Sequence, residues 1–188
     1  YNLAGWRLSA DDDCGGYDYT YDNLGRATDV DIEITGLTPV VAFAQQFDLM
    51  GRRTQLAAVI GSTDDFVTHY VYDNLGRIDT IKQQDQAGGN AVADKYVDFA
   101  FDLASRPDAV KRYADLGGTQ LVAETDYVFD NAGRLTDLTH DKGATTFADY
   151  DLTWDAAGRM TDFDFTSLVG DDGDADYTYD QTGQLTGS

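Results

Sequence analysis

The chain has 188 residues, of which 42% are hydrophobic and 12% aromatic, a composition typical of a folded domain rather than of a disordered segment. It carries 34 acidic and 13 basic side chains, a net charge of −21, which disfavours nucleic acids and anionic lipid surfaces as partners. We interpret the acidity first as a solubilising surface and second as a possible source of divalent-cation ligands. No run of 18 apolar residues occurs, so no membrane insertion is expected.

One short phrase recurs along the chain. The copies, in order, are YNLAGW from Tyr1, YDNLGR from Tyr21, FDLMGR from Phe47, YDNLGR from Tyr72, FDLASR from Phe101, FDNAGR from Phe129, WDAAGR from Trp154 and YDQTGQ from Tyr179. Successive copies start 20 to 29 residues apart, and most intervals are close to 25. Such a period indicates repeated units whose loops vary in length.

Each unit is predicted to be a β-hairpin. Before the Asp, aromatic residues alternate with small or β-branched ones, as in Tyr70-Val71-Tyr72, which is the pattern of a half-buried strand. Between the strands lies Asp-x-x-Gly: Asp suits the first position of a type I turn, and Gly suits the following position, where φ is positive. About seven antiparallel hairpins follow, with their aromatic residues in rows on one face of the sheet.

The residues expected to build these turns are the aromatic, Asp, Gly and Arg of each copy. They are Tyr21, Asp22, Gly25 and Arg26; Phe47, Asp48, Gly51 and Arg52; Tyr72, Asp73, Gly76 and Arg77; Phe101, Asp102 and Arg106; Phe129, Asp130, Gly133 and Arg134; Trp154, Asp155, Gly158 and Arg159; and Tyr179, Asp180 and Gly183.

This phrase resembles the YD repeat, or Rhs repeat, and the resemblance covers essentially the whole chain. Proteins of this kind include bacterial Rhs and wall-associated proteins, shells of insecticidal toxin complexes, and teneurins. The resemblance implies an all-β array of hairpins in a curved, spirally wound sheet, part of a hollow shell or tube, which in the toxin members encloses a C-terminal toxin domain. Residues 1–188 are expected to be one repeat region, a fragment of a longer chain with no separate second domain.

The chain departs from this pattern at three places. Ser105 stands where Gly is expected, so that turn either opens or is strained. Gln184 replaces an Arg, and the first copy has Asn2 for Asp and Trp6 for Arg.

A residue that recurs in every unit is expected to be structural, because an active site occurs once. We therefore predict no enzymatic activity and no cofactor, and expect Arg of one hairpin to bond Asp of its neighbour in a ladder. The two histidines, His69 on the face opposite Tyr70 and His140 at a strand end, lack ligand-spaced partners. A weak calcium candidate is formed by Asp172, Asp174 and Asp176, whose alternate spacing opens some calcium loops; a solvated turn is the preferred interpretation.

Two functions fit these observations. In the first, the chain is a shell segment of a secreted or cell-surface protein, with an enclosed toxin domain or neighbouring protomers as partners besides the other repeats of the polypeptide. In the second, it belongs to an extracellular adhesive or filament-forming protein built from stacked hairpins. The full-length sequence would discriminate between them, because a C-terminal core and toxin domain accompany only the first.

Overall fold

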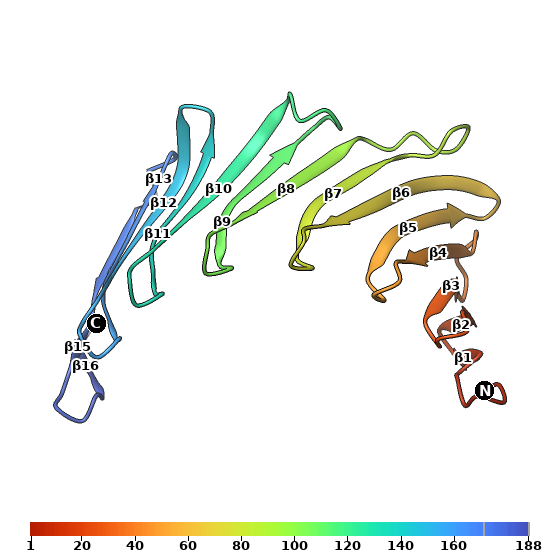
Figure 1. The fold of residues 1–188 in the computed structure, drawn as a ribbon, viewed down its shortest axis with the longest axis horizontal. Helices are drawn as coiled ribbons and strands as arrows, with labels where there is room; N and C mark the ends of the chain where they lie inside the picture. The colour runs from red at the N-terminus through yellow and green to blue at the C-terminus, as the bar shows by residue number, and fades with distance from the viewer. Residues whose placement is uncertain (171, 188) are drawn as a thin grey trace. The chain divides into compact units, whose positions relative to one another are not determined.

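The structure, a computed structural model, describes residues 1–170 and 172–187, and consists of antiparallel strands joined as hairpins in chain order (Figure 1). The strands are β1 (Ser9–Asp12), β2 (Gly15–Tyr21), β3 (Ala27–Ile34), β4 (Val41–Phe47), β5 (Arg53–Ile60), β6 (Thr63–Tyr72), β7 (Ile78–Asp85), β8 (Lys95–Phe101), β9 (Pro107–Tyr113), β10 (Leu121–Phe129), β11 (Leu135–Lys142), β12 (Thr145–Trp154), β13 (Met160–Ser167), β14 (Gly173–Asp176), β15 (Thr178–Tyr179) and β16 (Leu185–Gly187). The prediction of an all-β array of antiparallel hairpins is confirmed. The described residues contain no helix that is long and apolar enough to cross a membrane.

The contacts divide the chain into two compact units. The N-terminal unit comprises residues 1–96 and 114–117, and the C-terminal unit comprises residues 97–113 and the described residues from 118 onward. Strands β1 to β7 belong to the first, and strands β9 to β16 to the second; β8 contributes to both. Within each unit the hairpins pair with their neighbours along the chain, as β2–β3–β4 and β11–β12–β13 illustrate.

Alternation along the strands gives each unit an aromatic face and an opposite face. On the aromatic face of the N-terminal unit, Tyr19 lies opposite Val30, and Val30 lies opposite Phe43. In the C-terminal unit, Tyr150 stacks on Phe165 with ring centres 4.7 Å apart. Rows of this kind supply the cross-strand contacts that a single hairpin lacks.

Few of the described side chains are fully buried, because the strands form antiparallel sheets rather than stacked layers; β15 and β16 form a two-stranded sheet of their own. The buried apolar residues are Ala57, Ala58, Val67, Ala109 and Val110, and the buried polar ones are Thr68 and Thr125. These small side chains lie near the middle of central strands, where neighbours on both sides cover them. Stability must therefore come from half-buried aromatic contacts and from links between repeats.

Candidate functional site

The repeated turn is built around the Asp carboxylate, as Asp73 shows. Its Oδ1 accepts the backbone N–H groups of Leu75 (2.8 Å) and Arg77 (2.9 Å), and its Oδ2 accepts Arg77 Nε (2.7 Å). The backbone closes the turn with bonds from Asp73 N to Arg77 O (2.9 Å) and from Gly76 N to Asp73 O (3.0 Å). The same bonds form around Asp22, Asp48, Asp102, Asp130 and Asp155.

The glycine of the turn has the conformation that the sequence predicts. Gly25, Gly51, Gly76, Gly133, Gly158 and Gly183 all have φ between +80° and +84°, which confirms the turn assignment. Ser105 takes the same place with φ +64°, and Asp102 N still bonds Arg106 O at 3.0 Å. Of the two alternatives left by the sequence, this turn therefore stays closed and bears the strain of a side chain at positive φ.

The expected ladder is wrong in one respect, since each Arg forms its ion pair with the Asp of its own turn. Arg52 Nε and Asp48 Oδ2 lie 2.7 Å apart, because the turn brings residues four apart face to face. The guanidinium then reaches the next repeat by another route: Arg26 Nη1 donates to the backbone carbonyl of Asp48 at 3.0 Å. Arg134 and Arg159 make the corresponding bonds to Asp155 O and Asp180 O.

The same guanidinium groups cover the aromatic ring of the following copy. The guanidinium carbon lies 4.4 to 5.9 Å from the ring centre in five pairs: Arg26–Phe47, Arg52–Tyr72, Arg106–Phe129, Arg134–Trp154 and Arg159–Tyr179. Trp6, which replaces Arg in the first copy, packs on Tyr21 in the same way, with ring centres 5.5 Å apart. The forward link thus survives the replacement of the cation.

A second link, which was not predicted from the sequence, runs back to the preceding repeat. Tyr72 donates its hydroxyl to Arg53 O (2.8 Å), and Tyr179 donates to Met160 O (2.7 Å). Trp154 Nε1 makes the same bond to Leu135 O (2.7 Å). In each case the acceptor is the residue that follows the Arg of the previous copy, and a copy with Phe at this position has no donor for this bond.

The turn contacts lower the pKa of the Asp carboxyls. The backbone N–H of the following Arg is the largest cause for Asp48, Asp102, Asp130 and Asp155, and the Arg side chain adds to it. In Asp22 and Asp73, desolvation is the largest single influence and acts to raise the pKa, but the Arg bonds together outweigh it. In Asp180 the Thr182 hydroxyl and the Gln184 N–H lower the pKa in place of an Arg.

The opposite face of the C-terminal unit carries a row of carboxylates that the sequence analysis missed. Asp137, Asp151, Asp164 and Asp174 lie directly opposite one another across β11, β12, β13 and β14, and we call them the acidic row. The signal was present in stretches such as TDFDF, where Asp alternates with aromatic residues. That these carboxylates form a row could be recognised only once the register between adjacent strands was known.

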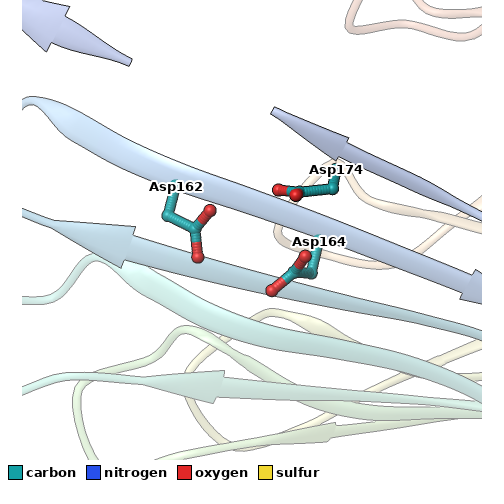
Figure 2. Close-up of side chains that lie close together, drawn as sticks. All are labelled: Asp162, Asp164 and Asp174. Atoms are coloured by element: carbon teal, nitrogen blue, oxygen red, sulfur yellow. The ribbon is translucent and has the colours of Figure 1, made fainter. Parts of the chain in front are cut away.

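Two members of the acidic row form a cluster with one further carboxylate. Asp162, Asp164 and Asp174 each offer an oxygen within 4.8 Å of the others, and Figure 2 shows them gathered along β13 and β14. Of the calcium residues considered from sequence, only Asp174 belongs to this group. Asp172 instead accepts Ser167 N–H at 2.7 Å, and Asp176 lies opposite Asp162 in the sheet. Three carboxylates supply fewer oxygens than the six to eight that Ca²⁺ takes, unless several bind through both oxygens.

Desolvation and neighbouring carboxylates raise the pKa of four carboxyls on this face. For Asp164 the main cause is the charge of Asp162, followed by desolvation and by Asp174. For Asp126, Asp137 and Asp149 the main cause is desolvation, followed by neighbouring carboxylates. The two sets of carboxyls therefore respond to acid in opposite ways.

The histidines lie in different units. His69 is exposed and lies opposite Gln55 and Lys82, on the face expected from sequence. His140 lies within β11, and its Nδ1 is 3.0 Å from the hydroxyl of Thr125 on β10. This partner is 15 residues away, so sequence spacing did not reveal it.

Comparison with known proteins agrees with the resemblance at the level of the fold. No model of a known protein family matches the chain, and no curated protein matches it. Among solved structures, it is similar to a chain of the Tc holotoxin pore of Photorhabdus luminescens, with a TM-score of 0.67 and 15% identity over 92% of this chain. The match spans 9% of that much longer chain.

Two further solved structures are more distant. A TcdB2–TccC3 complex without its hypervariable C-terminal region has a TM-score of 0.40 and 11% identity, and the match covers 95% of this chain and 13% of the other. A porin-like protein from Bacteroides uniformis has a TM-score of 0.43 and 13% identity, with 95% and 83% covered. Likeness at these levels adds nothing to the argument on function.

Proposed function

We propose that this chain is a wall segment of a hollow shell belonging to a secreted or cell-surface protein, and that the shell encloses or presents a toxin or effector domain. The observation that carries the proposal is the two-way link between repeats. Arg reaches forward to the next ring and carbonyl, and Tyr or Trp reaches back to the previous carbonyl. The Arg guanidinium and the Tyr or Trp donor of a repeat thus join it to its neighbours.

The wall itself is proposed to carry no catalytic activity. In the turns, the Asp oxygens and the Arg donors bond groups of their own or the adjacent repeat. The similarity to a holotoxin chain supports a structural part in a toxin assembly, because that protein contains the same hairpin fold. A proposed partner is therefore polypeptide, either a domain of the parent chain or a neighbouring protomer.

Electron microscopy of the full-length parent protein tests this proposal. We expect closed particles with an internal cavity, and limited proteolysis that spares any enclosed domain until the wall is unfolded. Open fibres that lengthen with protein concentration would instead support the filament alternative. A compact particle without a cavity, or hydrolytic turnover that maps to these 188 residues, would overturn the proposal.

A further inference from the structure

Thr125 is the largest side chain that is fully buried in the described part of the molecule, with 1% of its surface exposed. It lies on β10 between two other strands, opposite Val110 on β9 and His140 on β11. Its hydroxyl oxygen is 2.9 Å from Arg112 Nη1 and 3.0 Å from His140 Nδ1. One buried oxygen therefore joins side chains of three adjacent strands.

Hydrogen-bond satisfaction assigns the roles in this chain of hydrogen bonds. The Arg112 guanidinium can only donate, so the Thr125 oxygen accepts from it. A hydroxyl oxygen can accept twice, but its one hydrogen is buried and needs an acceptor, and of these two partners only His140 Nδ1 can accept it. With Nδ1 as the acceptor, the ring proton of a neutral His140 resides on Nε2.

The far side of the ring contacts the aromatic row. His140 meets Tyr150 edge to face, with ring centres 6.0 Å apart and planes at 90°, and Tyr150 stacks on Phe165. Strand alternation places the nearby carboxylates on the other side of the sheet. By strand alternation, the titratable and charged groups of β9 to β12 on the side of His140 include Asp108, Arg112, Tyr127, Lys142 and Tyr150. Those on the opposite side include Lys111, Glu124, Asp126, Asp137, Asp141, Asp149 and Asp151.

We propose that His140 is a proton-sensitive joint between the β9–β10 and β11–β12 hairpins, held by Thr125 as the neutral Nε2–H tautomer. A second proton on the ring turns Nδ1 from an acceptor into a donor. The Thr125 oxygen can then accept from both Arg112 and His140, but its own hydrogen loses its acceptor. Both flanking side chains are now cations, so the contact between β10 and β11 is weakened.

Nuclear magnetic resonance of the full chain labelled with ¹⁵N-histidine tests this directly, and exposed His69 serves as an internal reference. At about pH 7.5, we expect a bare, pyridine-type Nδ1 and a protonated Nε2 at His140. Thr125→Ser keeps the hydroxyl and should keep this tautomer. Thr125→Val removes the hydroxyl, and His140 should then show a mixture of tautomers similar to that of His69.

Amide hydrogen exchange gives a second readout. After correction for intrinsic rates, amides of β10 and β11 should exchange about tenfold faster at about pH 5.5 than at about pH 7.5 in the wild type and in Thr125→Ser. This step should be absent from Thr125→Val. A protonated Nδ1 in the wild type at the higher pH, or a tautomer mixture equal to that of His69, would overturn the inference. Neither result bears on whether the parent protein forms a shell.

Discussion

In the N-terminal unit, Ala57 lies between Ala44 and Val67 on the flanking strands, whereas in the C-terminal unit Asp151 lies between Asp137 and Asp164. Both rows occupy the face opposite the aromatic residues, and both belong to hairpins closed by the same Asp-x-x-Gly turn. The repeat therefore specifies the turn and the aromatic face and leaves the other face free to vary. In the N-terminal unit the middle of that face, on β4 to β6, carries small apolar side chains, and carboxylates such as Asp18 and Asp31 lie on the strands before it. In the C-terminal unit the carboxylates continue across four adjacent strands.

Acidification should separate the two units most strongly. Among the described residues, the carboxyls with a raised pKa, Asp126, Asp137, Asp149 and Asp164, all lie in the C-terminal unit. The folded state binds protons at these groups before the unfolded state does, so stability rises as pH falls from 7 towards the unfolded Asp value of about 3.9. The turn carboxyls have a lowered pKa, so their contribution is lost below that value.

We therefore expect Tm of the C-terminal unit to rise on mild acidification and to fall again in stronger acid. In a Trp6→Phe variant, Trp154 is the only tryptophan, so its fluorescence reports on this unit. The measurement is best made with His140→Gln as well, because the proposed weakening of the Thr125–His140 contact in acid would act against the expected rise in Tm. High salt at neutral pH should reproduce part of the rise, because it screens the row. A Tm that falls steadily from pH 7 downward would contradict the raised pKa of these carboxyls.

Glycine substitution tests the feature that both units share. Gly76→Val in the N-terminal unit and Gly158→Val in the C-terminal unit should each destabilise by about 1–3 kcal/mol, because a β-branched residue resists positive φ. Gly76→Val should cost more, since a Cβ there would lie 3.4 Å from Arg52 Nη1, while nothing lies within 4 Å at Gly158. Urea denaturation measures both, with Gly173→Val as a control at a glycine without positive φ.

The backward link is tested by exchanging Tyr and Phe. Tyr72→Phe removes the bond to Arg53 O and should cost about 0.5–1.5 kcal/mol in the free energy of unfolding. Phe47→Tyr offers a hydroxyl to the corresponding Ala27 carbonyl and should stabilise by a smaller amount. Tyr179→Phe should repeat the loss in the C-terminal unit, where the acceptor is Met160 O. If Tyr72→Phe and Phe47→Tyr change stability in the same direction, the backward link is not a general feature of the repeat.

Removing a charge from the acidic row, or adding one at Ala44 in the N-terminal unit, should give the smallest change in the free energy of unfolding. Asp151→Asn removes a like charge that lies opposite two others and should stabilise by roughly 0.2–1 kcal/mol, whereas Asp151→Glu should not. Ala44→Asp places a carboxylate opposite Asp29 and should destabilise the N-terminal unit by a similar amount. Both differences should shrink in high salt, and an effect independent of salt would show that packing rather than charge distinguishes the rows.

Local sequence sufficed where the chain repeats itself. The Asp-x-x-Gly turn depends on residues within five positions, so the positive φ of Gly76 could be predicted before the fold was known, whereas for Ser105 the sequence left an open turn and a strained one as alternatives. The link from Arg26 to Phe47 crosses 21 residues, and the sequence analysis assigned the Arg to the wrong carboxylate. The acidic row and the Thr125–His140 contact depend on strand register. Register cannot be predicted from sequence periodicity alone, because loop lengths vary and a bulge lies near each turn.

The forward and backward links between repeats also differ in what they require from the order of synthesis. Tyr72 bonds a carbonyl that precedes it in the chain, so a newly made hairpin can attach at once to one already formed. Arg52, in contrast, covers the ring of Tyr72 and has no ring to cover until that later repeat emerges. During synthesis, each new repeat therefore supplies the aromatic ring for the Arg of the repeat before it. The Arg of the newest repeat is then paired only with the Asp of its own turn until the next ring is made.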